Sequence, residues 1–265
     1  MILSEPINAC VSSAFCRETL DQLYALYNRR EFIHPDPLEF LHLYHDPLDR
    51  EIVGMVASAL AYGRVHQILK SVSEVLHRMG ESPSRFVLEQ TKGGMQKRFK
   101  DFRHRFTGGD QLAALLCGIR GVIRKHGSLQ VSFAAKCKAD DETILPGLTA
   151  FVKELGEEAR DEMNMLLPSP TRGSACKRLN LFLRWMVRDD DVDPGGWSEI
   201  GACKLIVPLD THMHRFGLGA GLTRRKQADM QAALEVTRAF RTIAPEDPVR
   251  YDFALTRLGI RDISV

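Results

Sequence analysis

The sequence lacks the paired cysteines that structural metal sites require. Its six cysteines, at positions 10, 16, 117, 137, 176 and 203, are scattered, and none forms a Cys-x-x-Cys pair. A zinc ribbon needs closely spaced pairs, and a C-terminal iron–sulfur cluster needs four cysteines after Cys203, so both are excluded. We therefore expect reduced thiols, as in a cytoplasmic protein, and no metal or other cofactor.

The sequence also has no long apolar run and no excess of charge. No stretch approaches about eighteen apolar residues, and the N-terminus lacks a basic segment followed by an apolar one. We therefore expect neither a membrane span nor a secretion signal. The 36 Lys and Arg residues against 34 Asp and Glu leave a formal charge of +2. An argument for nucleic-acid binding must therefore come from local charge.

Alternating apolar and polar residues bounded by turn dipeptides, the pattern of β-strands, are absent as well. Apolar residues recur instead at helical spacing along most of the 265 residues, as over 48–62, 65–79 and 112–126. The segment 48–62 is apolar nearly all round, which predicts a buried central helix. We expect an all-α protein with a core sufficient for one large domain or two lobes.

One short motif combines several chemically active side chains. An apolar run ends at Pro208 and is followed by the letters DTHMHR at 210–215. Aspartate is among the best helix N-caps, so Asp210 predicts a helix that starts at Thr211. The positive end of that helix would keep the Asp210 carboxylate ionised. Considered alone, such a residue is more often a structural cap than a catalytic group.

A second helix is expected over 174–188, after the proline-rich turn 167–173 (LPSPTRG). Lys177 lies in its first turn, and no acidic residue occurs from 172 to 188. A lysine near the start of a helix is ordinarily a solvated charge. Its position after a turn, on an arginine-rich helix that precedes the Asp-Thr-His letters, makes Lys177 and Asp210 a candidate pair.

This order of motifs resembles the helix-hairpin-helix DNA glycosylases of the endonuclease III superfamily (HhH-GPD). The spacing of the lysine and the aspartate is most similar to that of the archaeal 8-oxoguanine DNA glycosylases, and the blocks at 58–62 and 249–255 resemble core helices of that group. The strings HDPLD, SACKRLNLFLRWMVR, PLDTHMHR and DPVRYDFAL also look like a bacterial family of the DUF2400 type beside that superfamily. The second resemblance covers most of the chain.

The resemblance implies a two-lobed fold with a cleft between a helical barrel at 46–173 and a second domain that joins 1–45 to 174–265. It also implies a monomeric, cytoplasmic DNA base-excision glycosylase with AP-lyase activity, acting on oxidised purines such as 8-oxoguanine. In that chemistry a lysine amine attacks the sugar C1′ and forms a Schiff base. Lys177 would be the nucleophile, and Asp210 would stabilise the developing positive charge.

The resemblance assigns further residues to the substrate. Asp252 matches an acid of the archaeal enzymes and would contact the extruded base, on which Tyr62 would stack. Burial and cationic neighbours such as Arg178 would favour the neutral amine of the lysine. The hairpin that binds a phosphate in this superfamily is replaced by the longer turn 167–173. The remaining candidates for contacts with DNA are Arg172, Ser174, Arg184, Arg215 and His212.

Two other classes of function fit parts of the sequence. His212, His214 and Asp210 could bind the metal of a hydrolase if they lay on a strand, whereas on a helix the two histidines diverge by about 200°. The cap at Asp210 favours the helix, so we expect no metal site. The basic and aromatic segment 97–106, together with the arginine-rich helix, could instead bind nucleic acid without catalysis.

Overall fold

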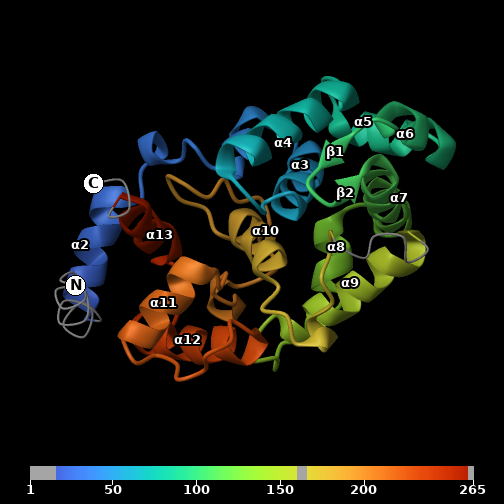
Figure 1. Cartoon of the computed structure of the whole chain (residues 1–265). Helices are drawn as coiled ribbons and strands as arrows, with labels where there is room; N and C mark the ends of the chain where they lie inside the picture. The colour runs from blue at the N-terminus through green and yellow to red at the C-terminus, as the bar shows by residue number, and fades with distance from the viewer. Residues whose placement is uncertain (1–15, 160–165, 262–265) are drawn as a thin grey trace.

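The computed structural model describes residues 16–159 and 166–261, and this part of the chain is all-α apart from one small hairpin (Figure 1). In Figure 1, α3 to α9 occupy one side of the molecule and α2, α11, α12 and α13 the other, with α10 between them. The described elements are α2 (Arg17–Tyr27), η1 (Arg30–Phe32), η2 (Pro37–Leu43), α3 (Pro47–Ala59), α4 (Val65–Met79), α5 (Pro83–Glu89), α6 (Lys92–Phe99), β1 (Arg103–His104), β2 (Thr107–Gly108), α7 (Gly109–His126), α8 (Leu129–Ala134), α9 (Leu145–Ala159), η3 (Pro170–Arg172), α10 (Lys177–Val187), η4 (Ala202–Lys204), α11 (Thr211–Gly219), α12 (Met230–Ile243) and α13 (Asp252–Arg261).

Helix α3 is the buried central helix that the sequence predicts. Asp46 caps it by accepting hydrogen bonds from the backbone N–H groups of Leu48 (2.9 Å) and Asp49 (3.0 Å). Every residue from Ile52 to Ala59 is buried, because α3 packs against α10 on one side and η2 on another. The apolar character all round the helix therefore reflects neighbours on several faces.

Helix ends agree with the sequence where a glycine has a positive φ angle. Gly80 (φ 86°) and Gly127 (φ 90°) end α4 and α7, as expected. Helix α9 instead continues through Gly156 to Ala159. The last helix starts at Asp252, because the preceding residues form a turn.

The expected absence of strands is also wrong in one place. Arg103–His104 pairs with Thr107–Gly108 in an antiparallel hairpin, so the basic and aromatic segment 97–106 is shared between the end of α6 and this hairpin. Two paired residues on each strand are too few to produce an alternating pattern in the sequence.

The first described helix packs against the last. Tyr251 donates a hydrogen bond to Asp21 (2.8 Å), and the guanidinium carbon of Arg250 lies 4.4 Å from the ring centroid of Tyr24. Residues far apart in the sequence are therefore neighbours where α2 meets α13 (Figure 1). The division into domains 46–173 and 1–45 with 174–265 stays a prediction. Within the described residues, no helix is both long and apolar enough to cross a bilayer.

Candidate functional site

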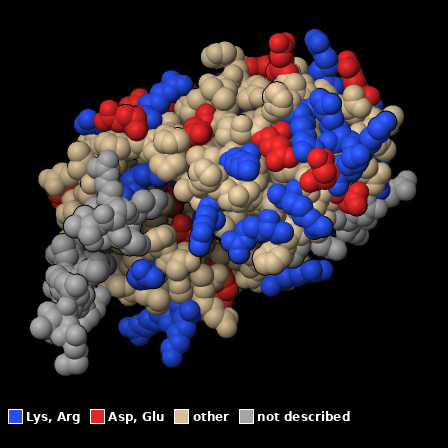
Figure 2. Space-filling view, turned by 45° about the horizontal axis from the view of Figure 1, so that its top comes forward, with Lys and Arg blue, Asp and Glu red and all other residues tan. Residues whose placement is uncertain are grey.

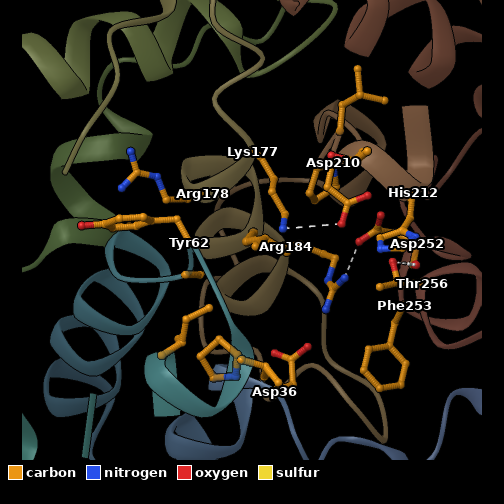
Figure 3. Close-up of a pocket in the computed structure, with 18 of the residues that line it drawn as sticks. Asp36, Tyr62, Lys177, Arg178, Arg184, Asp210, His212, Asp252, Phe253 and Thr256 are labelled. Atoms are coloured by element: carbon orange, nitrogen blue, oxygen red, sulfur yellow. Dashed lines mark hydrogen bonds and ion pairs between the residues drawn. The ribbon is translucent and has the colours of Figure 1, made fainter. Parts of the chain in front are cut away.

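A cleft of about 730 Å³ opens between the end of α3, the start of α10, the start of α11 and helix α13. Figure 2 shows basic side chains around a hollow in the surface, with acidic atoms inside it. Charged and polar side chains line much of the cleft. They include Asp36, Tyr62, Lys177, Arg178, Arg184, Asp210, His212 and Asp252 (Figure 3).

Asp210 caps α11, as the sequence predicts. Its Oδ1 atom accepts a hydrogen bond from the backbone N–H of Met213 (2.8 Å), and α11 starts at Thr211. Its Oδ2 atom points across the cleft and lies 3.5 Å from Nζ of Lys177 (Figure 3). The two oxygens therefore have separate partners, one in the helix backbone and one at the site.

Lys177 is the first residue of α10, which starts later than the sequence suggests. Ser174 pairs with Asp229 in an isolated bridge, and Cys176 adopts a left-handed conformation with φ 48° and ψ 37°. Burial raises the pKa of the Cys176 thiol to about 11, so this side chain stays neutral beside the lysine. The turn places the positive ends of α10 and α11 at the same cleft, where they favour a bound anion.

Asp252 lies inside the cleft and is only 4% exposed. Burial raises the pKa of its carboxyl group to about 6; Arg184, which donates a hydrogen bond to Oδ2, opposes this rise, and the nearby Asp210 adds to it. Asp252 is thus a buried acid held by an arginine and facing the Lys177–Asp210 pair (Figure 3). Its predicted contact with a base stays a prediction.

The arginine-rich face of α10 is a buried ion network. Arg184 donates to Oδ1 of Asp193 from Nε (3.2 Å) and from a terminal nitrogen (3.1 Å). Arg188 pairs with the same Asp193, with Asp190 (2.8 Å) and with Asp247 (2.8 Å). Acidic residues therefore already pair with both arginines, and contact of Arg184 with DNA stays a prediction. The acidic segment DDDVD at 189–193, directly after the helix, is the feature of the sequence that could have indicated these ion pairs.

Tyr62 forms one wall of the cleft just after α3. Its hydroxyl donates to the carbonyl oxygen of His104 (2.9 Å) and hydrogen-bonds with Oγ1 of Thr107 (2.7 Å). The guanidinium carbon of Arg178 lies 5.0 Å from the ring centroid, and burial lowers the pKa of this arginine. Tyr62 is therefore fixed at its hydroxyl end and covered by a cation. Stacking of Tyr62 on a base stays a prediction.

The two histidines of the motif point in different directions because they lie on a helix. His212 lines the cleft, whereas Nε2 of His214 donates to the carbonyl oxygen of Arg225 (2.8 Å). The prediction of a helix here is confirmed, and with it the divergence of the pair. In residues 16–159 and 166–261, no three His, Cys, Asp or Glu side chains are grouped closely enough to hold a metal ion.

The structure separates the remaining candidates for DNA contacts. Ser174 lines the cleft, and its Oγ accepts a hydrogen bond from the backbone N–H of Cys176 (3.2 Å). Arg172, in η3, and Arg215, on α11, are exposed and lie outside the residues that line the cleft. Only Ser174 of these three therefore shares the cleft with Lys177, and DNA contacts by the two arginines stay predictions.

Comparison with known proteins places this site within one family of sequences. Residues 36–261 match the family described as "Protein of unknown function (DUF2400)". This range includes every residue named above as lining the cleft. No curated protein and no solved structure matches the chain.

Proposed function

This chain belongs to the DUF2400 family, and we propose that it acts as a DNA glycosylase with AP-lyase activity. The observation that carries the proposal is the distance of 3.5 Å between Nζ of Lys177 and Oδ2 of Asp210 in a cleft of about 730 Å³. A primary amine beside an ionised carboxylate is the pair that Schiff-base glycosylases need. The resemblance to helix-hairpin-helix glycosylases supports the same reaction.

In the proposed reaction, the ammonium group of Lys177 first gives a proton to solvent, and the resulting amine uses its lone pair to form a bond to C1′ of an extruded nucleotide. The bond from C1′ to the base breaks, and its electron pair leaves with the base, which takes up a proton. The amine nitrogen then loses a proton, its electron pair forms the C1′=N bond as the C1′–O4′ bond breaks, O4′ takes up a proton, and an open-chain Schiff base remains. Loss of a proton from C2′ expels the 3′-phosphate, and water finally hydrolyses the Schiff base to regenerate the lysine.

Asp210 has an electrostatic role in this scheme. Its carboxylate faces the position where positive charge develops on the sugar as the base departs, and it can receive the proton that the amine releases. The hydrogen bond from the backbone of α11 to Oδ1 already fixes the orientation of the carboxylate. Oδ2 is therefore held facing Lys177, and little conformational entropy is lost during the reaction. Asp252, deeper in the cleft and ionised above about pH 6, would face the base, for which we propose an oxidised purine such as 8-oxoguanine.

A borohydride trap tests this proposal directly. Reduction of the Schiff base converts it to a stable amine, so the protein becomes covalently attached to labelled DNA and is resolved on a denaturing gel. We expect an adduct with at least one duplex of a panel that contains 8-oxoguanine, uracil or an abasic site. Lys177→Ala and Lys177→Arg should give none, because neither variant has a primary amine at this position.

Lys153→Ala is the matched control. Lys153 lies on α9, its side chain is 78% exposed, and among the described residues its ion pair is with Glu157 (3.7 Å), so its loss should leave the adduct unchanged. Absence of an adduct with every duplex, or equal trapping by Lys177→Ala, would contradict the proposed activity. The second candidate, a protein that binds nucleic acid without catalysis, is favoured by the basic residues of the β1–β2 hairpin and predicts DNA binding with no adduct.

A further inference from the structure

The turn of the β1–β2 hairpin exposes an aromatic side chain. Phe106 is 67% exposed, whereas every other phenylalanine of the described residues is buried or half-buried. A single exposed apolar residue is common on protein surfaces and by itself indicates nothing. The surroundings of Phe106 therefore decide whether it has a role.

The hairpin is attached to the wall of the cleft. The two residues that flank the turn, His104 and Thr107, both hydrogen-bond with the hydroxyl of the cleft residue Tyr62. Nε2 of His104 also donates to the carbonyl oxygen of Tyr62 (3.1 Å), and the two rings meet edge to face with centroids 4.6 Å apart. These contacts hold the turn, with Phe106 at its tip, beside the cleft.

Arg105 connects Phe106 to the rim of the cleft. Its side chain packs directly against Gly63, a residue that lines the cleft. A Cβ atom added to Gly63 would lie only 2.7 Å from Cδ of Arg105. Its guanidinium carbon lies 5.6 Å from the ring centroid of Phe106. Arg105 has a φ angle of 54°, a conformation that favours glycine or asparagine, so the turn uses an arginine where a smaller residue would be less strained.

The charged residues next to Phe106 along the chain are all basic. Arg103 and Arg105 are exposed, and no acidic residue occurs between Asp101 and Asp110. Asp101 is already paired with Arg78 at 2.7 Å. An exposed ring between exposed arginines is complementary to stacked bases between phosphates.

We propose that Phe106 inserts into the base stack of duplex DNA at the position that the reacting nucleotide vacates, with Arg103 and Arg105 on the adjacent phosphates. This inference rests on the proposed function, because in DNA with all its bases the vacancy exists only when a nucleotide is extruded into the cleft. An inserted apolar side chain offsets part of the lost stacking and keeps the vacancy open. Tyr62 cannot take this position, since its hydroxyl is bound to the hairpin and its ring is covered by Arg178.

Equilibrium binding to an unreactive duplex tests the insertion. The probe is a fluorescein-labelled duplex with one tetrahydrofuran abasic analogue, which has no C1′ hydroxyl and so forms no Schiff base. We expect Phe106→Ala to raise the Kd for this duplex by about tenfold or more, the usual effect of removing one stacking aromatic. Phe106→Trp should bind within about threefold of the wild type, because it retains a stacking ring. The matched control is Leu26→Ala on α2, where a 50% exposed side chain is truncated and no effect is expected.

The controls separate this inference from the proposed activity. A Phe106→Ala protein that binds the analogue duplex as tightly as the wild type overturns the insertion, whatever the borohydride trap shows. An equal loss of affinity for a single strand also overturns it, because stacking would then not require a duplex. A trap without adduct, combined with the expected effect of Phe106→Ala, overturns only the catalysis. If the wild type binds no DNA, both proposals fail.

Discussion

At the scale of single residues, Asp210 combines two roles that are usually found on different side chains. One carboxylate oxygen completes the first turn of α11, and the other lies opposite Lys177. The sequence was sufficient to predict the cap, since a cap depends on residues within one turn of the helix. The ion pair depends on the arrangement of two helices, and only the resemblance to glycosylases suggested it.

Substitution of Asp210 separates these roles. Asp210→Asn keeps a good N-cap and should lower the free energy of unfolding by less than about 0.5 kcal/mol, because the partly exposed ion pair adds little. Asp210→Ala removes the cap and should cost about 1 kcal/mol. Both should reduce the rate of adduct formation by about a hundredfold, since both remove the charge. Urea denaturation and timed borohydride trapping measure the two effects, and normal trapping by Asp210→Asn would contradict the electrostatic role.

Asp252 should make stability depend on pH. Its carboxyl group has a pKa of about 6 in the folded protein against an ordinary value of 3.8, so the folded state binds more protons between these values. The free energy of unfolding contributed by this group is therefore largest below about pH 4, falls as the pH rises towards about 6, and is constant above it. Asp252→Asn cannot titrate and should show a shallower fall in urea denaturation over this range. Parallel curves for the two proteins would contradict the raised pKa.

At the scale of elements, the helices were predictable wherever a local signal marks them. Asp46 marks the start of α3 and Gly80 the end of α4, each through contacts within a few residues. The start of α10 was not predictable, because Ser174 pairs with Asp229 on a distant segment and delays the helix until Lys177. The β1–β2 hairpin was not predictable for a related reason. It is held by a hydrogen bond from Tyr62, which is far away in the sequence.

The turn before α10 offers an element-level prediction. Gly173 has a φ angle of 78° with open space around it, so Gly173→Ala should destabilise the fold by about 1 kcal/mol through the backbone alone. Gly93→Ala is the matched control. Gly93 also has open space around it but lies in α6, where alanine should stabilise the fold by about 0.5–1 kcal/mol. Thermal denaturation should shift in opposite directions for the two variants, and a shift in the same direction would contradict the argument.

At the scale of the whole molecule, the near-neutral balance of 36 basic and 34 acidic residues conceals an uneven distribution. Arginines at the end of α10 form ion pairs with several acidic residues inside the protein, whereas Arg103 and Arg105 are exposed on the surface. Composition could not reveal this, because it counts buried and exposed charges alike. The buried network needs segments that meet only in the folded chain.

The surface distribution predicts binding that depends strongly on salt. If several exposed cations contact phosphates, the Kd for duplex DNA should rise by at least about tenfold between about 50 and 200 mM NaCl. Fluorescence anisotropy with the abasic-analogue duplex measures this effect. Arg103→Ala combined with Arg105→Ala should flatten the dependence by the contribution of about two phosphate contacts. An affinity that does not change with salt would contradict a role for these arginines.

One oxygen of Asp210 caps α11 and the other faces Lys177, and this arrangement has a consequence for the evolution of the family. Glutamate would move the charge away from the cap, and alanine would weaken the helix, so both changes disturb folding or geometry. Asparagine preserves the cap and removes only the charge. A single-nucleotide change converts an aspartate codon into an asparagine codon, so folded variants of this chain without the charge are one mutation away. Homologues with asparagine at this position are therefore expected to retain the fold and to carry out the proposed reaction about a hundredfold more slowly.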